Sequence, residues 1–141
     1  MHRIMQLWLL PYLLCCSTTV NAEIYVIGHP LIGVNALTAE QVRNIYLSKL
    51  KVLSNGVAVT PVDQVQDNPH RQAFYEKIVK LSARELGAYW SKRAFMEEKG
   101  RPPSISGDAA IIQWVSKNKG AVGYVSAPPN NNGVQVLLVI P

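Results

Sequence analysis

Segments rich in β-forming residues alternate with segments of helical periodicity, and this order constrains the fold more than any other feature of the sequence. The strand-like runs are residues 23–27, 57–62, 121–125 and 134–140, and the helix-like runs are residues 38–46, 69–80, 82–95 and 108–118. Strands that alternate with helices predict an α/β fold, in which helices pack on a layered sheet. A polar, proline-broken stretch at 97–103 and a turn-rich stretch at 128–133 are expected to be exposed loops.

The first 22 residues have the layout of a secretory signal peptide. A basic start at residues 2–3 precedes an apolar run at 4–16 and a small-residue cleavage site at 20–22. The run is shorter than the about 20 residues that span a bilayer. A lipoprotein anchored at Cys16 is the weaker alternative, because Cys15 stands where a small residue is wanted. We expect cleavage after Ala22 and a periplasmic location.

The remaining residues, 23–141, suffice for one domain with a modest core. Both cysteines of the chain lie in the first 22 residues, so the exported domain has no disulfide and no thiolate chemistry. The chain has 14 basic and 9 acidic side chains, a mild excess that favours anionic partners. These charges are scattered and lack interleaved aromatics, so nucleic acid is not an expected partner.

Two capping boxes mark helix starts. Thr38 with Gln41, and Ser82 with Glu85, have the spacing in which both side chains satisfy backbone N–H groups. The residues expected to face the core are Val42, Ile45, Tyr46, Phe74, Ile78, Leu81, Leu86, Tyr89, Trp90, Phe95, Ile111, Ile112, Trp114, Val115 and Tyr124.

The turn at Asn68-Pro69 leads from an extended stretch into a helix and has two interpretations. Asparagine before proline is an ordinary helix start. A helix start also exposes N–H groups that suit an anion. His70 and Arg71 place basic side chains on the first turn, where they oppose the helix dipole unless an anion or a carboxylate compensates. Asp67 is the carboxylate expected to pair with them.

Catalysis finds no support in the sequence. His29 and His70 are the only histidines after residue 22, and nothing near them has metal-ligand spacing. Neither a nucleophile elbow nor a phosphate-binding loop occurs. Asp63 and Asp67 fall across a strand-to-loop junction, which does not favour a carboxylate pair for acid–base work. We expect a protein that is not an enzyme and that uses no metal and no cofactor.

Three segments together resemble the phosphate-type periplasmic solute-binding proteins of ABC transporters. They are LTAEQVRNIYLSKLKVLSNG (37–56), VTPVDQVQDNPHRQAFYEKI (59–78) and GAVGYV (120–125), and their order and spacing match that family from Ile24 to Val125. The resemblance implies a type II periplasmic-binding-protein fold. Full members have two lobes that close on the anion and are more than twice this length. The resemblance therefore implies a short, single-lobe version, a single three-layer α/β lobe.

The ligand loop departs from the family pattern Arg-x-Asp-Gly-Ser-Gly-Thr. Gln64 stands in place of the arginine and Gln66 in place of the aspartate, while Asn68, Pro69 and His70 replace Ser-Gly-Thr. Glutamine makes no bidentate, charge-assisted clamp on an oxyanion, and proline removes a backbone donor. Anion binding through this loop is therefore expected to be weakened.

Two functions of different classes follow from the resemblance. The first is a periplasmic phosphate- or oxyanion-binding protein related to ABC-transporter substrate-binding proteins. Its ligand would contact Gln64, Asn68, His70 and Arg71, and a homodimer or a partner would supply the other face. The second is a non-transport interaction or sensory accessory module that keeps the lobe as a scaffold for an envelope or membrane-protein partner. In a third hypothesis, the strand at 134–140 lends its edge to a neighbouring chain.

Overall fold

The computed structural model describes residues 23–96 and 100–141, so the expected signal peptide and the loop residues 97–99 lie outside the described residues. A four-stranded sheet forms the centre of the molecule, with the strand order β2-β5-β1-β6. Its strands are β1 (Ile24–Gly28), β2 (Thr60–Pro61), β5 (Ala121–Val125) and β6 (Gln135–Ile140). β1 runs antiparallel to both of its neighbours, and β2 runs parallel to β5.

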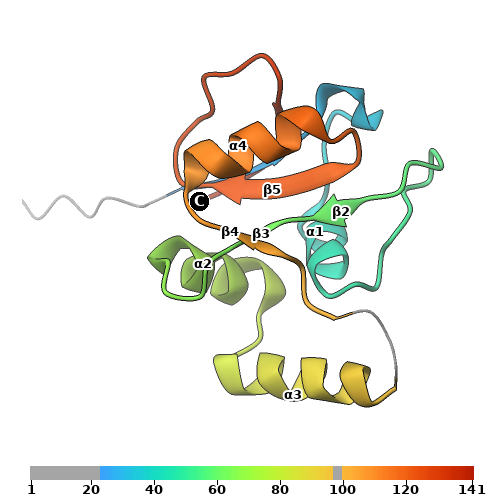
Figure 1. The fold of residues 1–141 in the computed structure, drawn as a ribbon, viewed down its shortest axis with the longest axis vertical. Coiled ribbons are helices and arrows are strands. Elements are labelled where there is room, and N and C mark those ends of the chain that lie inside the picture. The colour runs from blue at the N-terminus through green and yellow to red at the C-terminus, as the bar shows by residue number, and fades with distance from the viewer. Residues whose placement is uncertain (1–22, 97–99) are drawn as a thin grey trace, which may run out of the picture.

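Helices cover both faces of this sheet (Figure 1). The helical elements are the 3₁₀ turn η1 (Pro30–Ile32), α1 (Ala39–Tyr46), α2 (Pro69–Phe74), the π-helix η2 (Tyr75–Val79), α3 (Ala83–Phe95) and α4 (Asp108–Lys117). α4 lies on one face of the sheet, and α1 and α2 lie on the other, with α3 outside them. The result is the expected α/β arrangement in three layers.

Successive residues of β1 point to opposite faces of the sheet, as the pleat requires. Val26 joins the larger core cluster with residues of α1, α2 and α3, whereas Ile27 joins the smaller cluster beneath α4. In the larger cluster the rings of Phe74 and Tyr124 stack, with centroids 3.9 Å apart and an interplanar angle of 6°. Beside them, the hydroxyl of Tyr46 donates a hydrogen bond of 2.8 Å to the carbonyl of Val62.

Both predicted capping boxes are present. The Thr38 hydroxyl accepts from the amide of Gln41, whose side chain accepts from the amide of Thr38. Ser82 and Glu85 make the same reciprocal pair at the start of α3. None of the helices in the described part of the chain has the length and apolar character needed to cross a membrane.

The strand predicted at 57–62 is shorter than expected and is followed by a second sheet. β2 ends at Pro61, and β3 (Asp63–Gln64) pairs in parallel with β4 (Ser104–Ile105). The amide of Val62 still donates to Val122 of β5, whereas the amide of Asp63 donates to the carbonyl of Pro103 at 2.8 Å. The chain therefore leaves β5 and joins the segment of β4 between these two residues. Sequence patterns did not predict β4, because a two-residue strand has no period of its own.

Three other expectations were wrong in detail. The helix predicted at 69–80 is α-helical only to Phe74 and continues as η2 until Lys80, which has a left-handed φ of 58°. Phe95 and Trp114 were expected in the core but are 90% and 44% exposed. Helical geometry explains both: Phe95 lies on the far side of α3 from the buried Trp90, and Trp114 is turned by about 100° from Val115, which faces the sheet.

Candidate functional site

The turn before α2 is closed by its own hydrogen bonds. The Asn68 side chain caps the helix, with its Oδ1 accepting from the amide of His70 at 2.9 Å. Pro69 has no N–H to offer, and the amide of Arg71 donates to the carbonyl of Asn68 at 3.0 Å. The first three helical positions therefore present no unused backbone donor to an anion.

Gln64 is completely buried, and its side-chain amide bonds within the lobe. Nε2 donates to the carbonyl of Tyr124 at 3.2 Å and to Oδ1 of Asp108 at 3.3 Å. Oε1 accepts from Asn68 Nδ2 and from the amide of Gly107, both at 3.2 Å. These four bonds tie the starts of α2 and α4 to β5. In this structure the side chain supports the turn from inside the lobe and is not exposed at its surface.

Asp63 places a buried carboxylate directly beneath α2. It is 2% exposed, and its Oδ2 accepts a hydrogen bond of 2.6 Å from the hydroxyl of Tyr75. Oδ1 accepts from the hydroxyl of Tyr124 and, at 2.8 Å, from the amide of Gln64. Burial raises the pKa of Tyr75 and of Tyr124 well above the ordinary value, and the charge of Asp63 raises the pKa of both further. Both hydroxyls are therefore protonated donors at neutral pH.

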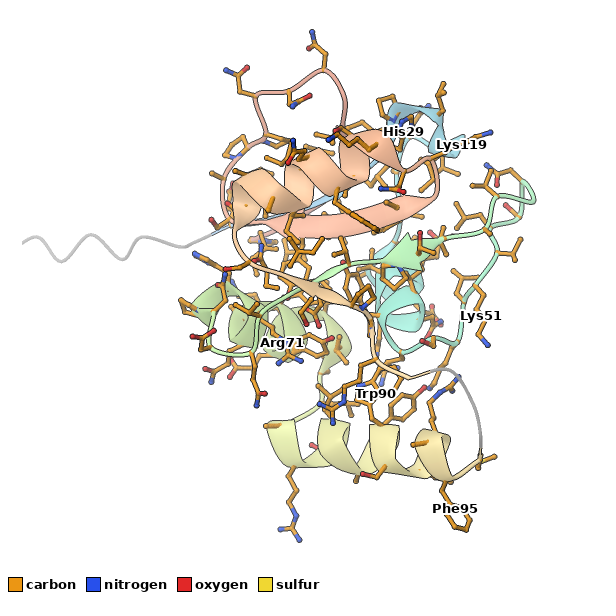
Figure 2. The ribbon with its side chains drawn as sticks, viewed as in Figure 1. His29, Lys51, Arg71, Trp90, Phe95 and Lys119 are labelled. Carbon is orange, nitrogen blue, oxygen red and sulfur yellow. The ribbon has the colours of Figure 1, made fainter. Side chains whose placement is uncertain are left out.

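Arg71 pairs with Asp63 and not with the expected Asp67. Its Nε lies 3.4 Å from Oδ2 of Asp63, and its guanidinium lies over the ring of Tyr75, 4.6 Å from the centroid. Asp63 reaches Arg71 because the start of β3 lies against the first turn of α2, a tertiary contact that sequence proximity does not reveal. The Arg71 side chain is 18% exposed. Figure 2 labels it among the side chains of α2. Among the described residues, its two terminal nitrogens make no hydrogen bond or ion pair.

Other ionisable side chains near this site are mostly basic. His70 is half-buried on the same first turn. The charge of Arg101 lowers the pKa of Tyr75, against the larger opposing effects of burial and Asp63, which places a second guanidinium in the neighbourhood. Asp67 is exposed. In the described part of the chain, no group of three or more His, Cys, Asp or Glu side chains is arranged to hold a metal ion.

Sequence reasoning found the turn but missed the residues that support it. Asp63, Tyr75 and Tyr124 form the buried hydrogen-bonded cluster, and Asp108 holds both Gln64 and Ser126. One local signal was present, since Tyr75 follows Arg71 by four residues and so lies on the same helical face. The contacts of Asp108 and Tyr124 span 44 and 60 residues, and no short motif marks them.

No family model matches the chain, and no curated protein sequence matches it. Solved structures do match. An ABC-type phosphate transport receptor from Vibrio cholerae superposes with a TM-score of 0.64 at 17% identity, over 82% of this chain and 46% of the receptor. PstS from Borrelia burgdorferi superposes with a TM-score of 0.63 at 12% identity, over 82% of this chain and 47% of PstS. A phosphate ABC transporter substrate-binding protein from Clostridium perfringens, solved with bound phosphate, superposes with a TM-score of 0.63 at 22% identity. The match covers 82% of this chain and 45% of that protein.

The chain therefore has the fold of one lobe of a phosphate ABC-transporter substrate-binding protein, as the sequence resemblance predicted. It spans about half the length of the solved proteins that it matches. These neighbours are described as transport receptors and binding proteins, a class without enzymatic activity.

Proposed function

We propose that the protein is an exported, phosphate-type solute-binding module that recognises a small oxyanion at the start of α2. The observation that carries the proposal is the state of Arg71. Asp63 and the Tyr75 ring hold the inner edge of its guanidinium, and its terminal nitrogens have no partner among the described residues. An arginine held in this way is ready to donate two parallel hydrogen bonds to an oxyanion.

The other predicted site residues have separate roles in this proposal. His70 supplies a second side-chain donor on the same turn. Asn68 caps the helix, and Gln64 holds Asn68 from below without touching the ligand. Because the backbone donors of the turn are already used, the anion depends on side chains alone. The negative charge of Asp63 lies behind Arg71 and weakens the attraction further, so we expect affinity in the millimolar range.

A single lobe leaves one side of the anion open to water. Ligand pockets usually bury 70–90% of the ligand surface, which one lobe does not do. We propose that a second copy of the chain, or a periplasmic or membrane-protein partner, supplies the missing face. The solved relatives that span twice this length support the idea that the fold works as half of a pair.

Calorimetric titration of the exported protein with phosphate and with sulfate tests this function. We expect weak, saturable heat that Arg71→Gln abolishes. Arg84→Gln is the matched control, since Arg84 is an exposed arginine on the first turn of α3 and should leave binding unchanged. No heat at millimolar ligand, from monomer and dimer alike, would contradict oxyanion binding.

The second candidate is an interaction or sensory module without solute binding. The closed turn favours it, because Gln64 and Asn68 bond to each other where the family pattern would leave an open cradle. In this case the face around α2 docks an envelope protein. Co-purification of one partner from envelope extracts, lost on substitution of exposed residues such as Gln66 and Asp67, would support it over the first. Capture that is insensitive to these substitutions would count against it.

A further inference from the structure

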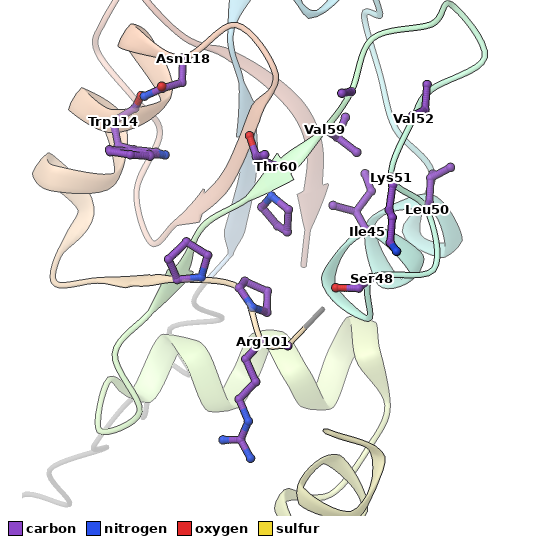
Figure 3. A pocket seen from close by; sticks show the side chains of 15 residues that line it. Ile45, Ser48, Leu50, Lys51, Val52, Val59, Thr60, Arg101, Trp114 and Asn118 are labelled. Atoms are coloured by element: carbon purple, nitrogen blue, oxygen red, sulfur yellow. The ribbon is translucent and has the colours of Figure 1, made fainter. Parts of the chain in front are cut away.

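A groove of about 630 Å³ opens beside the β2 edge of the sheet (Figure 3). Its walls come from four parts of the chain: the end of α1 with the loop that follows, β2, the segment before β4, and α4. None of the residues assigned to the oxyanion site lines it. The groove is therefore distinct from the turn before α2, with Arg101, whose charge also acts on Tyr75, between the two. Its volume falls in the range of small-molecule sites.

Large apolar side chains are exposed in this groove. Trp114 of α4 is 44% exposed and Val52 is 51% exposed, and Pro61 and Pro103 contribute further apolar surface between them. Figure 3 shows the Trp114 ring on one wall and Val52 on the opposite side. A half-exposed indole beside prolines offers a flat apolar surface to a ring.

The charges that the described residues bring to the groove have one sign. Within residues 23–96 and 100–141, Lys51 and Arg101 are the charged lining residues, and no acidic side chain of these ranges lines the groove. Both stand at the rim, and Lys51 lies across the groove from Trp114 (Figure 3). An apolar wall that faces a lysine complements a molecule with an apolar body and an acidic end.

We propose that the groove binds a small organic anion that combines a flat apolar ring with a carboxylate or sulfonate. The ring lies against Trp114 and the prolines, and the acidic group lies toward Lys51. This ligand class differs from the inorganic oxyanion assigned to the start of α2, because most of its binding energy comes from buried apolar surface.

The test uses 2-naphthoate as the anionic probe and 2-naphthol as its neutral counterpart. Calorimetry measures affinity, and quenching of tryptophan fluorescence locates the probe. In a Trp90→Phe background, Trp114 is the only tryptophan of residues 23–141 and reports on the groove. We expect saturable quenching by 2-naphthoate and affinity for 2-naphthol weaker by about tenfold. Equal affinity for the two probes, or no saturable binding, would overturn the proposal.

Variants assign the binding to the groove. Trp114→Ala and Lys51→Glu should each weaken 2-naphthoate binding by about tenfold or more. Lys117→Glu is the matched charge control, because Lys117 is exposed on α4 but does not line this groove. Both target residues are exposed, and circular dichroism checks that each variant is folded. An unchanged affinity in either target variant would place the probe elsewhere and refute the assignment.

Two further measurements separate this site from the proposed oxyanion site. Excess phosphate should not displace 2-naphthoate, and Arg71→Gln should bind 2-naphthoate as tightly as the unmodified protein. Displacement by phosphate would mean that the probe occupies the start of α2, and the groove proposal would fail while oxyanion binding stood. Groove binding without any response to phosphate would instead leave the groove proposal intact and contradict the oxyanion function.

Discussion

The carboxylate of Asp63 accepts a hydrogen bond of 2.6 Å from the hydroxyl of Tyr75, twelve residues further along the chain. The bond joins the first residue of β3 to the first residue of η2. Tyr124 donates to the other oxygen of the same carboxylate, and Arg71 pairs with it. A buried charge is tolerated in this position because donors from three elements converge on it.

Removing this charge should destabilise the fold. Asp63→Asn replaces an acceptor of several bonds by an amide whose NH₂ group faces tyrosine hydroxyls or Arg71. We expect a loss of about 3 kcal/mol in the free energy of unfolding, measured by urea denaturation. Asp67→Asn, at an exposed position in the same loop, should change stability by less than about 0.5 kcal/mol. Equal effects of the two substitutions would show that the Asp63 cluster contributes little.

Gln64→Leu tests the support of the turn from inside. The substitution keeps the size of the side chain but leaves the amide of Gly107, Nδ2 of Asn68 and the Tyr124 carbonyl without their partner. We expect a loss of about 2–4 kcal/mol in thermal or urea unfolding. Gln66→Leu at an exposed position is the matched control and should be nearly neutral. A stable Gln64→Leu variant would contradict the role that we assign to this residue.

Stability should fall steeply in alkaline solution. Burial raises the pKa of Tyr46, Tyr75 and Tyr124 above that of tyrosine in the unfolded chain, which is about 10. Below the pKa of the unfolded chain, each tyrosine makes its full contribution to the free energy of unfolding. Above it the unfolded chain releases protons that the folded chain retains. Each such tyrosine then lowers the free energy of unfolding by about 1.4 kcal/mol per pH unit.

Urea denaturation at increasing pH measures this loss, and tyrosinate absorbance follows ionisation in the same samples. We expect the absorbance of the buried tyrosines to appear together with unfolding. Substitution of Tyr75 by Phe should flatten the pH dependence. Ionisation of all tyrosines near pH 10, while the protein is still folded, would contradict the prediction.

The two glycines of GAVGYV are required by close packing. A Cβ on Gly120 would lie 2.1 Å from the carbonyl oxygen of Ala58, and a Cβ on Gly123 would lie 2.7 Å from Ile111 Cγ2. We expect Gly123→Ala to cost about 1–3 kcal/mol, and Gly120→Ala to cost more because backbone must move. Gly87→Ala in α3 is the control: nothing lies within 4 Å, and helix propensity should stabilise by about 0.5–1 kcal/mol. Thermal unfolding of the three variants checks this order.

Local patterns in the sequence predicted the elements well. Both capping boxes formed as expected, since each depends on residues three apart. Val42, Ile45 and Tyr46 face the core, as their helical spacing required. The prediction that Phe95 and Trp114 face the core was wrong. Hydrophobicity alone does not tell which side of a helix is covered.

The site was less predictable because it depends on distant contacts. The turn at Asn68 and its cap were visible in the sequence, but the partner of Arg71 was misjudged. Asp67 is close in sequence, whereas Asp63 is brought under α2 by the pairing of β3 with β4. The same holds for Gln64, whose alignment with a family arginine suggested contact with ligand, while its hydrogen bonds to Tyr124 and Gly107 depend on tertiary packing.

The position of β1 between β5 and β6 has a consequence for biogenesis. Ile24 pairs with Ile140, so β1 is synthesised long before β6, the strand that covers its second side. Closing a loop of that size early is entropically costly, and pairings so distant in sequence form slowly. A nascent chain that lacks β6 keeps one side of β1 unpaired. The central sheet is therefore expected to close only after β6 has left the ribosome.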